Sequence, residues 1–205
     1  MALFFGITLP LLVLYLLFLA WYGGKGKPLQ PDEIDAFFST LGKMNLSESE
    51  KEIIPEIRRL LAKDDGQEFV MQNLVRYRPK ALYPAGYSYG DDARAADRRY
   101  GKAIILPLLR QGSLPVFIAR RSGSFIEPEG ADVWHYVAMV RYRSRRDFLR
   151  FALAIQQQDI AVHKWAALEK THVFPVKPLV SLMLVRSSVA GLLALLAAIL
   201  FALLR

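Results

Sequence analysis

The sequence predicts an α+β domain held between two membrane-spanning helices. Residues 2–22 and 187–204 carry no charged side chain, whereas the segment between them mixes charged and apolar residues as a soluble domain does. Within residues 68–178, short runs rich in β-branched and aromatic residues alternate with longer runs of helical spacing. This alternation is typical of an α+β fold. A chain of 205 residues is expected to hold one such domain with appendages.

Composition narrows the class of protein. Hydrophobic residues make up 53% and charged residues 22% of the chain, which excludes a disordered or low-complexity protein. The chain has no cysteine, so disulfides, thiolate metal sites and cysteine nucleophiles are excluded. The basic character lies in residues 68–178, which hold eighteen basic and ten acidic residues. We therefore expect this segment to face something anionic, such as lipid headgroups.

Residues 1–22 are predicted to be an uncleaved transmembrane helix. The uncharged stretch would be about 31 Å long as a helix, enough to cross a hydrocarbon core of about 30 Å. A cleaved signal peptide would begin with a basic region and end in small residues. Here the stretch ends in Trp21 and Tyr22, which suit the membrane interface.

Residues 179–205 contain the second predicted transmembrane helix. Its uncharged part would be about 27 Å long, with Arg186 and Arg205 able to reach the two interfaces. A stripe of small residues would allow close approach to the first helix or to a second subunit, although an ordinary Ala/Leu-rich span explains it equally. The stripe consists of Ala190, Gly191, Ala194 and Ala198.

The flanking charges predict the orientation. Lys25, Lys27, Lys177 and Arg186 lie on the domain side of the two spans, and only the amino terminus and Arg205 lie beyond them. Basic residues close to a span favour the cytoplasmic side. We therefore expect a two-span protein of the cell (inner) membrane, with a cytoplasmic central domain in contact with membrane lipids.

Residues 23–67 are predicted to form a helical stalk or linker. A short helix is expected from Pro31 to Met44, with acidic residues in its first turn. Ser47, followed three residues later by Glu50, is the start of a capping box. It opens an amphipathic helix that ends at residues 64–66.

Residues 68–178 are predicted to be a ferredoxin-like β-α-β-β-α-β domain. We expect strands at 69–78, 114–121, 133–143 and 171–176, and helices at 93–111 and 145–170, the second with a break near Gln158. In this fold four strands form an antiparallel sheet with both helices on one face. The third strand is apolar on both faces, so a second sheet is expected to cover the free face, most simply in a homodimer.

Several motifs resemble a family of small domains of unknown function in the dimeric α+β-barrel superfamily, to which the antibiotic-biosynthesis monooxygenases are related. The resemblance covers about residues 68–178 and implies a dimeric α+β barrel. This chain has His135 where that family often has an acid after the tryptophan. The motifs are Gln72–Arg78, Ala81 with Tyr83 and Pro84, Arg99–Gly101, Trp134, Val140–Arg145, Phe148 with Leu149, His163 with Lys164, and Ala167–Glu169.

Three residues are candidates for catalysis. His135 could be a general base, a proton donor or a haem ligand, or a histidine hydrogen-bonded at the sheet edge. Arg141 could bind a carboxylate or phosphate, or form a salt bridge at an interface. Tyr100, on the first helix of the domain, is either a core residue or a third candidate.

Four residues are candidates for binding a ligand: Asn73, Arg76, Tyr83 and Tyr87. Asn73 lies in an apolar strand and needs hydrogen-bond partners if it is buried. Arg76 could bind an anion or pair with a carboxylate at an interface. Tyr83 and Tyr87 belong to a tyrosine-rich loop that could cover a pocket, contact the membrane or be an ordinary turn.

Metal, cofactor and nucleic-acid sites are not expected. The three histidines lack metal-ligand spacing, and the sequence has no glycine-rich phosphate loop or nucleophile elbow. RNA-recognition modules share the order of elements but carry a Gly/aromatic signature on the third strand, and residues 137–142 lack it. No metal, cofactor or nucleic acid is therefore predicted.

Two functions remain open. The first is an accessory subunit or small-ligand-binding module of a membrane complex, because the chain shows no decisive catalytic constellation and devotes two segments to anchoring. The alternative is a monooxygenase-like enzyme acting on an apolar aromatic or lipid-derived substrate, which the resemblance implies. An apolar pocket between the sheet and the helices, lined by His135 or Arg141, would favour the enzyme.

Overall fold

The computed structural model describes residues 1–23, 26–44, 46–179 and 184–204, and it divides the chain into two compact units. One unit consists of the terminal segments Met1–Gly24 and Pro178–Arg205, and the other is Lys25–Lys177. Lys25 and Arg205, on which the predicted orientation partly depends, lie outside the described residues.

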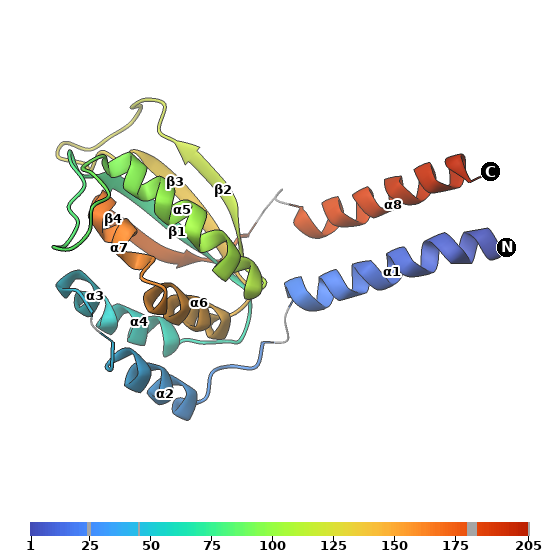
Figure 1. Cartoon of the computed structure of the whole chain (residues 1–205), viewed down its shortest axis with the longest axis horizontal. Helices are drawn as coiled ribbons and strands as arrows, with labels where there is room; N and C mark the ends of the chain where they lie inside the picture. Colours follow the sequence, from blue (N-terminus) through green and yellow to red (C-terminus); the bar gives the residue numbers. More distant parts are fainter. Residues whose placement is uncertain (24–25, 45, 180–183, 205) are drawn as a thin grey trace. The chain divides into compact units, whose positions relative to one another are not determined.

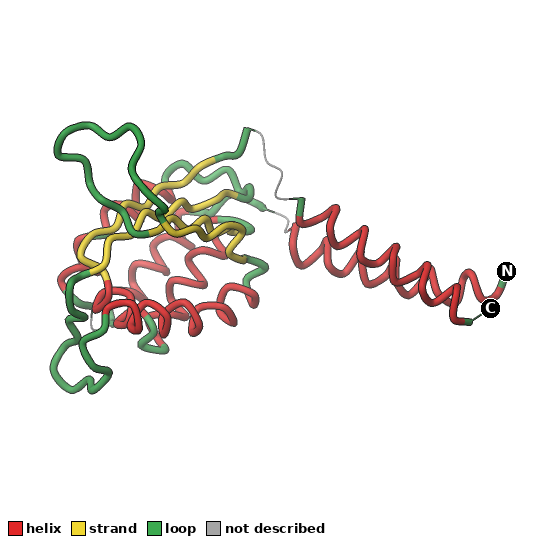
Figure 2. The backbone as a smooth tube through the Cα atoms, turned by 90° about the horizontal axis from the view of Figure 1, so that it is seen from above, coloured by secondary structure: helices red, strands yellow, loops and turns green. Residues whose placement is uncertain are grey.

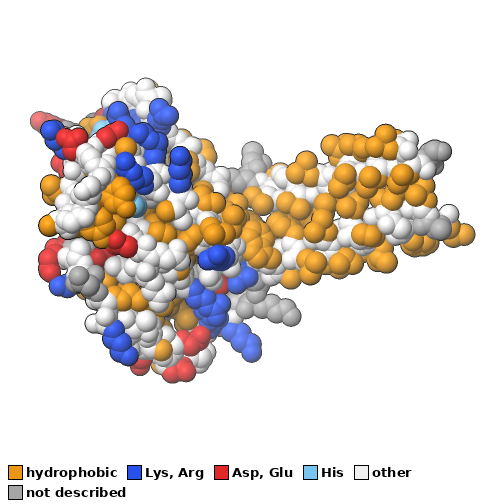
Figure 3. All heavy atoms as spheres, in the orientation of Figure 1, with side chains coloured by type: hydrophobic (Ala, Val, Ile, Leu, Met, Phe, Trp, Pro, Cys, Tyr) orange, Lys and Arg blue, Asp and Glu red, His pale blue; other side chains and the backbone are white. Residues whose placement is uncertain are grey.

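Two helices form the terminal unit, α1 (Ala2–Gly23) and α8 (Val185–Leu203). Both are long and apolar enough to cross a membrane, and apolar side chains cover them (Figure 3). Hardly any of these side chains is buried within the structure. An apolar helix without protein cover is what a lipid-facing segment requires.

Helices α1 and α8 lie side by side and antiparallel (Figure 1). Phe4 stacks on Phe201 with ring centres 5.7 Å apart. Near the other end, the hydroxyl of Tyr15 donates to the carbonyl of Arg186 over 3.4 Å. The guanidinium of Arg186 lies 4.8 Å from the centre of the Tyr22 ring. The start of each helix therefore contacts the end of the other.

The small-residue stripe of α8 does not form this contact as a whole. Ala190 is partly buried, but Gly191, Ala194 and Ala198 are exposed. A Cβ atom at Gly191 would meet nothing within 4 Å. The close approach of α8 to α1 through this stripe is not seen in the described residues, and contact of the stripe with a second subunit stays a prediction.

The unit Lys25–Lys177 contains an α+β domain with a four-stranded antiparallel sheet. The strand order is β2-β3-β1-β4, and Asn73 of the central strand β1 lies opposite Ala138 of β3 and Val173 of β4. The strands are β1 (Phe69–Tyr77), β2 (Leu114–Arg120), β3 (Tyr136–Tyr142) and β4 (Leu168–Val176). The helices are α2 (Pro31–Leu41), α3 (Glu48–Glu52), α4 (Ile54–Leu61), α5 (Ala93–Arg110), α6 (Arg145–Gln157) and α7 (Ala161–Ala167).

Within this unit, the helices lie against one face of the sheet, here called the helix face (Figure 2). Alternate residues of a strand point to the same side, so Phe69, Met71 and Val75 of β1 enter the core together with Val140 and Tyr142 of β3. The intervening residues of both strands point to the opposite face, here called the free face. None of the helices described in this unit lies on the free face.

Residues 26–67, predicted as a stalk, pack on α6 within the same unit. Leu29, Phe37 and Leu61 form a buried cluster with Leu149 of α6. The side chain of Glu50 accepts from the backbone N–H of Ser47 over 2.8 Å, so the predicted capping box is present. The single predicted amphipathic helix is divided into α3 and α4.

The last predicted helix is also divided. Asp159 has a φ of +54°, a left-handed conformation that ends α6 close to the expected break at Gln158. Helix α7 then ends at Ala167, and β4 begins at Leu168 rather than at Thr171. The prediction extended the helix too far because Ala166, Ala167 and Leu168 are good helix formers, whereas pairing with β1 extends the chain there.

Candidate functional site

A cavity of about 1740 Å³ lies mainly between the helix face of the sheet and the helices, and its lining also includes His172 and Phe174 of the edge strand β4, which alternate onto the free face. It exceeds the range of about 300–1,000 Å³ that is usual for small-molecule pockets. Its walls come from all four strands, from α5, α6 and α7, and from the segment α2–α4. Most of the lining side chains are apolar or aromatic, so the interior suits an apolar ligand.

Small side chains keep this space open where the sheet meets α5. Ala138 of β3 and Gly101 of α5 both line the cavity. A Cβ atom at Gly101 would meet nothing within 4 Å, so no neighbouring side chain fills the space in front of this glycine. A glycine inside a helix costs up to about 1 kcal/mol relative to alanine, and here it leaves room in the cavity.

Three polar side chains meet at one end of the cavity. Asp97 of α5 accepts hydrogen bonds from the hydroxyl of Tyr77 over 2.8 Å and from that of Tyr136 over 3.1 Å. Burial, together with the charge of Asp97, raises the pKa of both tyrosines above the ordinary value. Both therefore remain neutral hydrogen-bond donors, and they tie α5 to β1 and β3.

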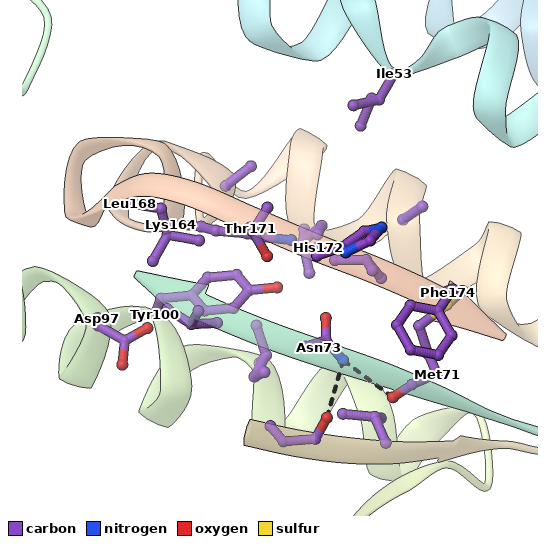
Figure 4. Close-up of a pocket in the computed structure, with 18 of the residues that line it drawn as sticks. Ile53, Met71, Asn73, Asp97, Tyr100, Lys164, Leu168, Thr171, His172 and Phe174 are labelled. Carbon is purple, nitrogen blue, oxygen red and sulfur yellow. Dashed lines mark hydrogen bonds between the residues drawn. The ribbon is translucent and has the colours of Figure 1, made fainter. Parts of the chain in front are cut away.

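Lys164 and Tyr100 provide further polar groups on the cavity wall (Figure 4). The ammonium nitrogen of Lys164 lies 5.1 Å from the ring centre of Trp165 and 6.0 Å from that of Tyr100. Burial lowers the pKa of Lys164, although the carboxylate of Asp97 opposes this shift. Burial also raises the pKa of Tyr100. Lys164 is thus a partly buried basic residue beside two aromatic rings.

Asn73 lines the same cavity from β1. Its side-chain amide donates to the carbonyl of Met71 over 3.0 Å and to that of Ala138 over 3.4 Å. In Figure 4 the side chain of Tyr100 points from α5 toward Asn73. The amide group of Asn73 is therefore held by backbone carbonyls of the sheet.

His135 lies on the lining of the cavity next to the start of β3. Its Nδ1 accepts a hydrogen bond from the backbone N–H of Tyr77 over 3.0 Å. Its own backbone N–H donates to the carbonyl of Val75 over 2.7 Å. Because Nδ1 is an acceptor, the neutral ring carries its proton on Nε2. The side chain thus joins the ends of β1 and β3, and its catalytic role stays a prediction.

Arg141 does not line the cavity; it points to the free face and is buried, with 4% of its surface exposed. Its guanidinium pairs with Glu68 and donates to the carbonyl of Gly112 over 2.8 Å. Arg76, also on the free face, makes two hydrogen bonds of 2.9 Å to Glu169. Both arginines have carboxylate partners within the domain.

Tyr83 and Tyr87 are not part of the cavity lining either. The hydroxyl of Tyr83 is 2.9 Å from Nδ1 of His163 on α7, and that of Tyr87 donates to Asp159. The rings of the two tyrosines stack with centres 6.1 Å apart. These contacts attach the tyrosine-rich loop to the segment between α6 and α7, and its function stays a prediction.

The structure thus brings together Tyr100, Asn73 and His135 of the seven candidates. Sequence reasoning missed Asp97 and Lys164 as members of a site. Lys164 stands between His163 and Trp165, and no local signal tells whether a lysine on a helix faces the sheet. Among the described residues, no cluster of three or more histidine and acidic side chains could hold a metal ion.

Comparison with known proteins adds two solved structures. No protein-family model and no curated protein matches the chain. The chain is similar to a methylated RPA0582 protein, with 26% identity and a TM-score of 0.54 over 67% of this chain and 95% of the other. It is also similar to the RPA0582 protein of unknown function from Rhodopseudomonas palustris, a structural genomics target, with 25% identity and a TM-score of 0.53 over 67% and 98% of the two chains. These similarities support the α+β fold of the domain.

Proposed function

We propose that the chain is a membrane-anchored protein that binds a small apolar ligand in the cavity between its sheet and its helices. The cavity itself carries this proposal. A cavity of about 1740 Å³ with a mainly apolar lining and a few converging polar groups has the features of a ligand site.

We assign the domain to the ferredoxin-like fold and, within it, to a dimeric α+β barrel. The strand order β2-β3-β1-β4, the antiparallel pairing and the helices on one face support the assignment. The free face carries Leu74, Val137 and Met139, each partly exposed. A second copy of the chain would cover these side chains, sheet against sheet.

Two membrane anchors would keep the domain at a membrane, which is a source of apolar ligands. We propose that α1 and α8 cross the inner membrane and that the domain is cytoplasmic, because Lys27, Lys177 and Arg186 flank the spans on the domain side. A single cysteine at the exposed Ser88 should be protected from an impermeant maleimide in intact cells, and one appended after Arg205 should react. The reverse pattern would overturn this orientation.

Binding can be tested with a variant that fills the cavity. Gly101→Phe places a ring where a Cβ atom meets nothing within 4 Å. Gly191→Phe is the matched control, since Gly191 is also a helical glycine with open space before it but lies on the exposed side of α8. Native mass spectrometry of the full chain released from detergent should show hexadecanol bound to the wild type and to Gly191→Phe, and lost from Gly101→Phe.

Absence of binding of hexadecanol, and of a ligand with the same chain and a carboxylate head, to the wild type would overturn the proposed function. Equal binding to Gly101→Phe and the wild type would place the ligand elsewhere. Circular dichroism of each variant in the same detergent checks that the substitution leaves the fold intact.

An enzymatic role, in which the chain is a monooxygenase-like enzyme, is favoured by the position of His135 on the cavity lining. Because Nδ1 accepts from Tyr77, Nε2 of the neutral ring would donate a hydrogen bond to a substrate. The substrate would be an apolar aromatic or lipid-derived compound. Conversion of such a compound by the wild type, with loss in His135→Gln and unchanged hexadecanol binding, would support catalysis over binding alone.

A further inference from the structure

We propose that the ligand is an amphipathic carboxylate, such as a fatty acid, whose head is bound by Lys164 and Tyr100 while its apolar chain fills the cavity. This inference rests on the proposed function and adds the chemical class of the ligand. It depends on two hydrogen-bond donors, Lys164 and Tyr100, and on the charged residues of the cavity lining.

Lys164 is the first element of the site. Its ammonium group makes no hydrogen bond and no ion pair with any residue in the described part of the chain. Contact with the rings of Trp165 and Tyr100 compensates a cation only in part. Lys164 is partly buried, and a cation with reduced access to water and no ion-pair partner either loses its proton more readily or gains from an anionic partner. The lowered pKa of Lys164 reflects that cost, and a bound carboxylate would offset it.

Tyr100 is the second element. Its hydroxyl forms no hydrogen bond to the residues that the structure describes, whereas the hydroxyls of Tyr77 and Tyr136 both donate to Asp97. Burial keeps Tyr100 protonated, so it is a donor. Lys164 comes from α7 and Tyr100 from α5, and both line the cavity near Asn73 (Figure 4). Two such donors can satisfy the two oxygens of one carboxylate.

The charge of the lining favours an anion over a cation. Among the described residues, eight lysines and arginines and three acidic residues line the cavity. Four of the arginines, Arg59, Arg98, Arg121 and Arg145, pair with carboxylates, whereas Lys164 makes no such pair within the described part of the chain. Asp97 is the acid that faces Lys164, and its oxygens already accept from two tyrosines. The other two acids are Glu50 and Glu56, on α3 and α4. A monoanionic head fits one ammonium and one hydroxyl, whereas phosphate groups are usually held by several basic or backbone donors.

The test compares two ligands that differ only in the head: palmitate and hexadecanol. We measure binding of each to the full chain by native mass spectrometry from detergent. A charge-assisted contact that the alcohol cannot make predicts that palmitate binds the wild type at least about tenfold more tightly than hexadecanol. Lys164→Met keeps a flexible apolar side chain of similar length and should abolish this preference while hexadecanol binding is unchanged.

Lys102→Met is the matched control, since Lys102 lies on the exposed side of α5 and does not line the cavity. This variant should keep the preference for palmitate over hexadecanol.

Tyr100→Phe removes only the hydroxyl group. It should weaken palmitate binding several-fold with little effect on hexadecanol binding, and it keeps the proposal testable if Lys164→Met fails to fold. Equal binding of both ligands to the wild type, or a preference that survives in both variants, would overturn this inference and leave the proposed function standing. Binding of neither ligand to the wild type would overturn both.

Discussion

The two sides of the sheet differ in whether their basic side chains have a carboxylate partner. On the free face, Arg141 pairs with Glu68 and Arg76 pairs with Glu169. On the helix face, Lys164 lines a cavity with two aromatic rings near its ammonium group, and no carboxylate within ion-pair distance among the described residues. The comparison teaches that an arginine with a carboxylate partner needs no ligand, whereas a partly buried lysine without one gains from an anionic ligand. This contrast, more than residue type, indicates which face has a binding site.

The largest loss of stability is expected from breaking the ion pair between Glu68 and Arg141 on the free face. Glu68→Gln removes the carboxylate and leaves the guanidinium of Arg141 in place, bonded to Gly112. We expect a loss of about 3 kcal/mol in the free energy of unfolding, the lower end for a broken buried pair, because Glu68 is 41% exposed. Denaturation of the full chain in detergent, followed by circular dichroism, measures it.

The control for this variant is Glu56→Gln, which breaks an exposed pair with Arg59. A pair of this kind contributes less than about 1 kcal/mol. Equal losses in the two variants would mean that Arg141 is not a structural cation, and its candidacy as a ligand-binding residue would be restored.

On the helix face, Asp97→Ala should destabilise the domain by about 2 kcal/mol, because two partly buried tyrosine hydroxyls lose their acceptor. The same change should lower the pKa of Lys164 further, since Asp97 raises it. Denaturation measures the stability, and an NMR titration of isotopically methylated lysines measures the pKa. A pKa that rises in this variant would contradict the assigned surroundings of Lys164.

A smaller change in stability, and in the opposite direction, is expected for Gly101→Ala. Gly101→Ala should stabilise the domain by about 0.5–1 kcal/mol, because alanine favours the helix and its Cβ meets nothing within 4 Å. Gly86→Ala is the contrasting variant, since Gly86 has a φ of +95°, which alanine adopts only under strain. A melting temperature that falls in Gly101→Ala would mean that the cavity is filled at this point.

The smallest contribution to stability is expected from the ion pair between Glu33 and Arg146, which joins α2 to α6. The hydrogen bond from Arg146 lowers the pKa of Glu33 from 4.5 to about 2. The folded pKa lies below the unfolded one, so the stabilisation is present above about pH 4.5 and is lost as the pH falls toward 2. Because the pair is exposed, it amounts to less than about 1 kcal/mol.

Melting temperatures of the wild type and of Arg146→Met across this pH range measure that contribution. The difference between the two proteins should shrink as Glu33 becomes protonated. A difference that is constant from pH 7 to pH 3 would show that packing, and not the ion pair, holds the segment.

Much of the fold follows from local patterns in the sequence. The strands were predictable because β-branched and aromatic runs mark them, and the Ser47 cap because serine and glutamate stand at the right spacing. The division of the last helix at Asp159 was visible as a break. The start of β4 at Leu168 was not, since its extended backbone depends on pairing with a strand about ninety residues earlier.

The site was only partly predictable. Asn73 and Tyr100 could be singled out because one is polar in a strand and the other stands in a motif. Lys164 could not, because nothing local tells whether a lysine on a helix faces water or the sheet. The pairing of Arg141 with Glu68 depends on the antiparallel alignment of β1 with β3, so the sequence left its role open.

The central claim is that the helix face, and not the free face, holds the ligand. Photo-crosslinking of the full chain with a hexadecanol analogue that carries a terminal diazirine tests it most directly, with crosslinked residues located by mass spectrometry. We predict crosslinks to cavity-lining residues such as Met71, Ile104 and Trp165, and their loss in Gly101→Phe. Crosslinks to Gln72, Leu74 and Met139 on the free face, with none in the cavity, would contradict the account.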